Sequence, residues 1–168
     1  ETQVIALLMS ADAENDSDVL AITGASAARA LAASLMEKPN PGERLGMIGG
    51  QYIITPTYGE RKESLLDLIV AGTSEGIVMV EAGAKEVTET QVVGALEAAH
   101  AAIKEIIAGI EDLRAAAGKQ KLLVQKREIG HAFYREVEEK VYAPLSEAMR
   151  IRGKLESYDR VDQVLEDY

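Results

Sequence analysis

Cysteine is absent from the 168 residues of this chain, and no apolar run approaches the length of a membrane-spanning helix. Without cysteine, disulfides and thiolate metal sites are excluded. A membrane-spanning helix needs about 18 or more consecutive apolar residues, so we expect no membrane partner. The start of the chain also lacks a basic segment followed by a short apolar one, which is the pattern of an export signal. These absences predict a soluble chain.

Positive charge is scarce as well. Lysine and arginine total 18 against 28 acidic residues, which gives a net charge of -10 and a pI near 4.7. A basic, phosphate-binding surface over the whole chain is therefore excluded, although a local basic patch is not. Residues 1–84 hold 12 acids and 5 bases, whereas residues 85–168 hold 16 acids and 13 bases. The second half is thus the less repulsive towards a polyanion.

Apolar residues make up 47% of the chain, which is enough to bury the core of one or two modest domains. The sequence lacks an initial methionine and enters an apolar run at once, ETQVIALLMSA. We therefore expect a segment of a longer protein. Within that run, Val4 to Met9 is short and almost continuously apolar, which predicts a β-strand buried on both faces.

The next stretch predicts one helix and a hairpin. The helix is expected to begin near residues 16–18, after a polar loop with capping residues, and to run to about residue 35. Two prolines and a glycine in MEKPNPGE, residues 36–43, break it. In RLGMIGGQYIITPT, Gly49 and Gly50 can both take positive φ, as the two-residue turn of a type I′ hairpin requires.

A second hairpin and a long helix follow. The hairpin pairs residues 66–71 with residues 77–81. At Thr88 the pattern changes, because Thr88 and Gln91 stand three apart and form a capping box. An apolar stripe with helical spacing then continues towards Gly118, which is a suitable stop. The stripe consists of Val92, Leu96, Ala99, Ile103, Ile106, Ile110 and Leu113.

From residue 119 onwards the sequence reads as helical. Pro144 ends or kinks the first helix of this part. The apolar stripes of its two helices are Phe133, Val137 and Val141, and then Tyr158, Val161, Leu165 and Tyr168. We therefore predict an α+β fold, with a sheet and packed helices in residues 1–87, a long closing and bridging helix in residues 88–118, and an all-helical domain in residues 119–168.

Several side chains that often carry chemistry have an ordinary structural interpretation here. Ser26 lies in GASAA, which lacks the closing glycine of a nucleophile elbow. His100 and His131 lie on different helices without a zinc-binding partner one turn away. The alternating acids from Asp12 to Asp18 lack the glycine and the bidentate glutamate of a calcium loop. We therefore predict no metal site in this chain.

One local basic cluster remains, around the apolar residues LLV. Lysine and arginine near the end of a helix complement its dipole, which is the structural interpretation. Contact with RNA phosphates is the functional alternative. The cluster consists of Lys119, Lys121, Lys126 and Arg127.

Four stretches of the sequence resemble the bacterial polynucleotide phosphorylase family. They are, in order, ETQVIALLMSADAENDSDVLAITGASAA, YIITPT, LLDLIVAGTSEGIVMVEAGAKEVTE and GALEAAHAAI. Their order and spacing resemble the later part of the first ribonuclease-PH-like core of that family. The tail from about Lys119 resembles the helical domain that links its two cores. The resemblance implies a partial ribonuclease-PH-like sheet with packed helices, followed by an all-α domain.

The resemblance also implies a function for the longer protein. Enzymes of this family degrade RNA from its 3′ end by phosphate attack, release nucleoside diphosphates, and can run in reverse to add nucleotides. The resemblance implies a cytoplasmic homotrimer that acts on RNA, joins RNA-degrading assemblies, and uses phosphate with Mg²⁺ or Mn²⁺. It implies no cofactor held by this chain itself.

Asp67 is the residue that the resemblance connects with catalysis. In the active second core of the family, the equivalent strand carries Asp-x-Lys, with a further aspartate six residues upstream. Two carboxylates hold the metal there, and the lysine offsets charge on the attacked phosphate. Here Asp67 is retained, but Ile69 replaces the lysine and Arg61 replaces the upstream aspartate. The resemblance thus implies that Asp67 is a remnant and that the chain is a non-catalytic scaffold.

Two questions stay open at this point. The family usually carries an apolar, strand-like run where this chain has MEKPNPGERL, residues 36–45, so that strand is either shortened or rebuilt as a loop. The alternative function is a stand-alone RNA-binding or protein-interaction module without catalysis. The basic cluster is the sequence feature that supports this alternative.

Overall fold

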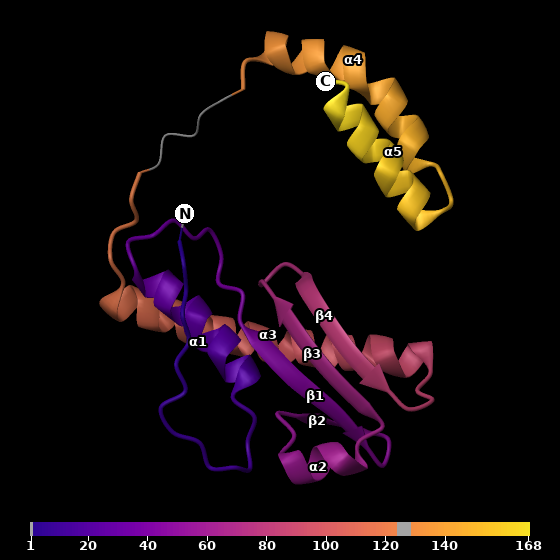
Figure 1. Ribbon diagram of the computed structural model, residues 1–168. Coiled ribbons are helices and arrows are strands. Elements are labelled where there is room, and N and C mark those ends of the chain that lie inside the picture. The colour runs from indigo at the N-terminus through magenta and orange to yellow at the C-terminus, as the bar shows by residue number, and fades with distance from the viewer. Residues whose placement is uncertain (1, 124–128) are drawn as a thin grey trace. The chain divides into compact units, whose positions relative to one another are not determined.

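The computed structural model describes residues 2–123 and 129–168 (Figure 1). The chain divides into two compact units, residues 1–124 and 125–168. No helix among the described residues is long and apolar enough to cross a membrane. In chain order, the first unit contains α1 (Asp18–Leu31), β1 (Gly42–Ile48), β2 (Gln51–Ile54), α2 (Tyr58–Glu63), β3 (Leu66–Gly72), β4 (Ile77–Ala84) and α3 (Glu89–Ala117).

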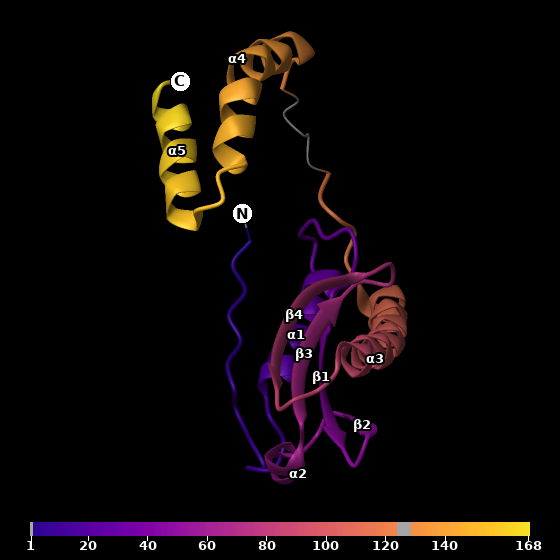
Figure 2. The same ribbon diagram turned by 90° about the vertical axis from the view of Figure 1, so that its right-hand side faces the viewer.

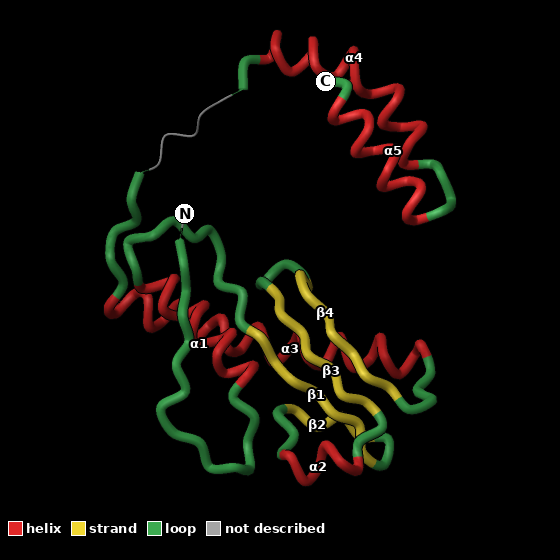
Figure 3. Tube along the Cα trace, viewed as in Figure 1, coloured by secondary structure: helices red, strands yellow, loops and turns green. Residues whose placement is uncertain are grey.

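The four strands form one antiparallel sheet in the order β2-β1-β3-β4, which confirms the α+β prediction (Figure 3). Both predicted hairpins are present. Gly49 and Gly50 form the first turn with φ of 57° and 78°, values that glycine adopts without a steric penalty. Ile48 pairs with Gln51 across that turn. The second hairpin joins β3 to β4, with a register shift at Ala71 and Gly72.

Helix α3 covers one face of the sheet, as Figure 2 shows. Alternate residues of a strand point to the same face, and the buried rows of β1 and β3 pack on the small and branched residues of α3. Each fully buried leucine in such a core contributes about 1.5–3 kcal/mol. The core consists of Leu45, Met47, Leu66, Leu68, Val70, Ala95, Ala99, Ile103 and Ile107.

The start of α3 has the predicted capping box between Thr88 and Gln91. The apolar stripe was predicted less well, because Ile107 rather than Ile106 is buried and Leu113 is exposed. The buried residues Ala95, Ala99, Ile103 and Ile107 are spaced four apart and lie on the helix face that the sheet covers. The predicted stripe steps by three residues from Ile103 to Ile106, and Ile106 lies to the side of that face.

Two other predictions about the first unit need correction, and the open question about residues 36–45 is answered: the strand is shortened there. Val4–Met9 is not a strand: the segment has no strand partner among the described residues, and most of its large side chains are exposed. An isolated strand leaves its backbone groups without hydrogen-bond partners. Helix α1 ends at Leu31, four residues earlier than predicted. In the stretch 36–45, residues 42–45 belong to β1 and the residues before them form no strand.

The second unit contains α4 (His131–Met149) and α5 (Lys154–Glu166), which pack on each other as a hairpin. Ala148 and Val164 are buried between the helices, and the Ser157 hydroxyl donates to the carbonyl of Ala148 at 2.9 Å. Pro144 lies within α4, which continues beyond it and is bent along its length (Figure 2). A proline inside a helix removes one backbone hydrogen bond and kinks the axis.

Candidate functional site

Asp67 lies in β3 on the sheet face that α3 does not cover. Its neighbours in sequence, Leu66 and Leu68, point into the core under α3, so the Asp67 side chain points the other way. The residues directly opposite it on the flanking strands are Gly46 and Gly83. Because neither neighbour carries a side chain, the space beside the carboxylate is open to side chains from other positions.

Two arginines fill that space. Arg44 of β1 donates through Nη1 to Asp67 Oδ1, and Arg61 of α2 donates through Nη2 to Asp67 Oδ2 at 2.9 Å. Arg44 also pairs with Asp18, and Arg61 donates to Asp16 Oδ2 at 2.6 Å. We call this set of two arginines and three aspartates the Asp–Arg network.

The Asp–Arg network joins four separate pieces of the chain: the loop before α1 and its first residue, β1, α2 and β3. Helix α2 holds Arg61 in place, because the capping box of Thr57 and Glu60 fixes the start of this short helix. The guanidinium carbon of Arg61 also lies 5.7 Å from the centroid of the Tyr58 ring. These local contacts position Arg61, and ion pairs between residues distant in sequence link the network's members to one another.

Burial strengthens these contacts. The Arg44 side chain is only 5% exposed, and although burial alone would lower its pKa, hydrogen bonds with Asp18 and Asp67 and the charges of those carboxylates raise it. For Asp16, burial alone would raise the pKa. The hydrogen bonds from the Asp18 N–H and the Arg61 guanidinium, together with the charges of Arg44 and Arg61, outweigh burial, and the pKa of Asp16 is lowered. Both groups are thus held in their charged forms.

The Asp–Arg network does not fit a divalent metal ion. Both oxygens of Asp67 already accept from guanidinium groups, and a metal ion needs several free oxygen ligands. Among the described residues, no group of three acids, histidines or cysteines is placed to bind a metal ion. Ile69, where the family resemblance implies a lysine, lines a hollow of about 320 Å³ beside Asp67, together with Glu81.

The predicted basic cluster is divided by the structure. The Lys121 ammonium donates to the carbonyls of Arg29, Ala30 and Ala32 at 2.8, 2.9 and 2.6 Å, so it caps the end of α1. Lys119 has an exposed side chain. Lys126 and Arg127 lie outside the described residues.

The other residues singled out in the sequence have structural contacts. The Ser26 hydroxyl is buried and accepts from the Asn40 N–H at 2.9 Å. His100 Nε2 lies 2.9 Å from the carbonyl oxygen of Thr73, and His131 is exposed at the start of α4. Asp12 accepts from backbone and side-chain N–H groups in its own loop, with Asn15 contributing most, and its pKa is lowered to about 2.

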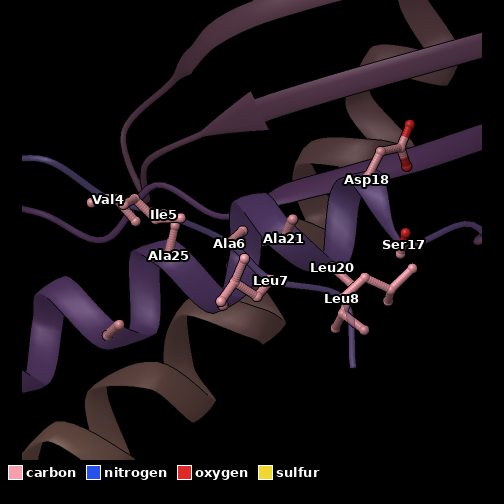
Figure 4. A pocket seen from close by; sticks show the side chains of 12 residues that line it. Val4, Ile5, Ala6, Leu7, Leu8, Ser17, Asp18, Leu20, Ala21 and Ala25 are labelled. Carbon is pink, nitrogen blue, oxygen red and sulfur yellow. The ribbon is translucent and has the colours of Figure 1, made fainter. Parts of the chain in front are cut away.

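A larger hollow lies between the N-terminal segment and α1 (Figure 4). Its volume is about 460 Å³, and apolar side chains such as Ile5, Leu8 and Leu20 make up most of its lining. The polar residues along it are Ser17 and Asp18. Asp18 already pairs with Arg44, so this hollow offers no set of groups for catalysis.

Comparison with known proteins agrees with the family resemblance of the sequence. The sequence model described as "3′ exoribonuclease family, domain 2" matches residues 43–102. The polyribonucleotide nucleotidyltransferases of Acidobacterium capsulatum and Koribacter versatilis are 43% and 44% identical to this chain, over 99% and 98% of its length. That of Aquifex aeolicus is 41% identical over 98%. The chain spans only 21%, 20% and 21% of these relatives.

The Asp–Arg network was missed by sequence reasoning. Arg61 and Ile69 were identified as replacements for catalytic groups, but Arg44, Asp16 and Asp18 were not connected with Asp67. Arg44 lies between Glu43 and Leu45 in a strand that is buried almost throughout. A charged residue in such a strand requires a partner, and this signal could have predicted an ion pair, although not which acids form it.

Proposed function

Because this chain corresponds over nearly its whole length to a segment of polyribonucleotide nucleotidyltransferases, we propose that it is part of a protein that degrades RNA from the 3′ end. The reaction would be phosphorolysis, in which phosphate attacks the terminal linkage, nucleoside diphosphate is released, and the reverse reaction adds nucleotides. The similarity to relatives of that name and the match to a 3′ exoribonuclease family domain support this proposal.

Within that protein, this chain is a non-catalytic scaffold. One observation carries this proposal: both oxygens of Asp67 are held by arginine side chains of the same chain. A carboxylate used in this way has no oxygen free to bind a metal ion. Its role is to tie α2, β1 and the loop before α1 to the centre of the sheet.

The longer protein would use Mg²⁺ or Mn²⁺ with phosphate, and would act as a cytoplasmic homotrimer that works together with other RNA-degrading proteins. Residues outside this chain would hold the metal and phosphate. Support for these features comes from the similarity to the named relatives alone.

Two measurements test the scaffold role. The isolated 168-residue chain, incubated with poly(A), Mg²⁺ and phosphate, is expected to release no nucleoside diphosphate. In the longer protein, Asp67→Asn should lower kcat by less than about threefold, whereas loss of a catalytic acid costs about 10²–10⁴-fold. Robust release by the isolated chain, or a hundredfold loss of kcat in a correctly folded variant, would refute the scaffold role.

The alternative is a stand-alone RNA-binding or protein-interaction module. The basic cluster was the feature that suggested it, and Lys121 now has a structural contact that uses its ammonium group. Among the described residues, Lys119 is left from that cluster as a cation free to meet a phosphate. Neutralising all four cluster residues, Lys119, Lys121, Lys126 and Arg127, and measuring RNA affinity across salt concentrations separates this alternative from the scaffold role.

A further inference from the structure

The C-terminal end of α1 is closed by a segment from the far end of the first unit. A helix leaves its last carbonyls without partners inside the helix. Here the Lys121 ammonium donates to the carbonyls of residues 29, 30 and 32. Backbone N–H groups at 2.9 Å close the remaining ones, in the pairs Ala32 to Ala28, Lys119 to Leu31 and Leu122 to Ala33. Every carbonyl from residue 28 to residue 33 therefore has a partner.

We call residues 119–122, which follow α3 directly, the strap. The strap belongs to the first unit, which ends at residue 124. Apolar burial does not hold it, because the Leu122 side chain is 64% exposed and Lys119 and Gln120 are exposed as well. The half-buried Lys121 side chain supplies three of the five hydrogen bonds between the strap and the end of α1. The strap is thus held by polar contacts, and mainly by one side chain.

These contacts are favourable but can be exchanged for water. A cation at the C-terminus of a helix interacts favourably with the helix dipole, and a charged donor forms stronger hydrogen bonds than a neutral one. Water can replace the strap, because carbonyls at a helix end are readily solvated. Segments with few buried apolar contacts open at a lower free energy than the core of a fold. The strap can therefore open while the sheet stays folded.

Helix α1 has other anchors that do not depend on the strap. Asp18 at its start pairs with Arg44, and the Thr23 hydroxyl donates to the Gly42 carbonyl at 3.0 Å. Further along the helix, the Ser26 hydroxyl accepts from the backbone N–H of residue 40. Release of the strap would therefore leave α1 on the sheet and loosen only its last turn.

We propose that the strap is a releasable part of the connection between the two units, held closed by Lys121. Helix α4 of the second unit begins at His131, so the closed strap leaves residues 123–130 as the connection to α4. Release adds residues 119–122 to this connection and extends its maximum span by about 13–14 Å. The state of the strap thereby sets how far the second unit can move from the first, and it couples that reach to the order of the end of α1.

Hydrogen exchange of the 168-residue chain tests the role of Lys121. In the wild type, the amides of Lys119 and Leu122 should be protected, but less than the amides of β3, because the strap opens without the sheet. Lys121→Met should lower the protection of both strap amides by about tenfold or more, since it removes three hydrogen bonds from a charged donor. The β3 amides should remain the more protected ones in this variant.

Two control variants accompany this measurement. Lys121→Arg keeps the positive charge and the N–H donors and should retain most of the protection of the strap amides. Lys119→Met removes an exposed side chain but keeps the backbone hydrogen bond to Leu31, so its strap amides should exchange as in the wild type. A loss of protection in Lys121→Met alone would assign the closed state to the ammonium group.

A spin label measures release of the strap directly. The chain has no cysteine, so Gln120→Cys, at an exposed strap position, carries a single nitroxide. The label should be restricted in the wild-type background and with Lys119→Met, and should move freely with Lys121→Met. Unchanged mobility with Lys121→Met would overturn the proposal. Equal protection of the strap and β3 amides in both the wild type and Lys121→Met would do so too, because the strap would then open only when the whole unit unfolds.

Discussion

Arg61 Nη2 lies 2.9 Å from Asp67 Oδ2, at the place where the family resemblance implies a second acid in a catalytic core. In such a catalytic core, two neighbouring carboxylates repel each other, and the metal ion that they bind supplies the positive charge that offsets this repulsion. Here Arg44 and Arg61 supply the positive charge from within the chain. The Asp67 carboxylate is thereby held in a fixed contact between β1, α2 and β3.

Removing Arg44 should destabilise the protein strongly. Arg44→Met leaves Asp18 and Asp67 without their shared buried partner. Because the two carboxylates are 40% and 37% exposed and water can solvate them, we expect a loss of about 1–3 kcal/mol in the free energy of unfolding. Urea unfolding followed by circular dichroism measures this loss. Lys38→Met is the matched control, because Lys38 and Glu75 form an exposed pair at 45% and 71% exposure, which contributes at most about 1 kcal/mol. Similar losses for the two variants would contradict the structural role of the Asp–Arg network.

The Asp–Arg network should also make stability depend on pH through Asp16. Its pKa in the folded chain is below the ordinary value of 3.8, so the unfolded chain binds the proton more tightly. The stabilisation is therefore fully present above about pH 4 and is lost as pH falls through the folded pKa. Urea midpoints between about pH 6 and about pH 3 should fall more steeply for the wild type than for Asp16→Asn. Parallel curves would show that Asp16 contributes nothing to the acid response.

Lys121 should act as a structural residue. Lys121→Met leaves three carbonyls at the end of α1 without their charged donor, which we expect to cost about 1–3 kcal/mol in the free energy of unfolding. Lys119→Met removes an exposed lysine two residues away, and its backbone N–H bond to the Leu31 carbonyl is retained. The control should therefore unfold at nearly the wild-type urea concentration. Equal effects of the two substitutions would show that the ammonium contacts contribute little.

Two glycines of α3 should respond in opposite ways to alanine. At Gly94, a Cβ would lie 2.5 Å from the Tyr52 hydroxyl, which donates to the Gln91 carbonyl at 2.8 Å. Gly94→Ala should therefore lower the free energy of unfolding by about 1–2 kcal/mol. Gly109 has open space around it, so Gly109→Ala should raise stability by up to about 1 kcal/mol through helix propensity. Thermal unfolding of both variants measures the difference, and a stabilising Gly94→Ala would contradict the close approach of β2 to α3.

The elements that local chemistry specifies were predicted from the sequence. Gly49 and Gly50 specify the turn of the first hairpin, and the capping box at Thr88 specifies the start of α3, because each signal acts over a few residues. Val4–Met9 was predicted wrongly because an apolar run becomes a strand only when another strand pairs with it. Such a partner is a property of the tertiary structure and cannot be derived from the run itself.

The candidate site was predictable only in part, for a related reason. That Arg61 and Ile69 stand where catalytic groups are expected is implied by the family resemblance alone, and the linear sequence is enough for that prediction. The contact that explains Asp67 joins it to Arg44, 23 residues away, and Arg44 in turn to Asp18, 26 residues away. Sheet register brings these residues together, and register depends on the whole set of strand pairs.

Strand β4 lies at the end of the sheet order and pairs only with β3 among the described residues. Every one of its eight residues is exposed, including Val78 and Val80. Its outer side therefore presents a row of backbone donors and acceptors next to apolar side chains, which is a template for any extended peptide. We therefore expect this chain to aggregate and turn turbid as it is concentrated. A short peptide that pairs with the free edge of β4 should keep the sample clear.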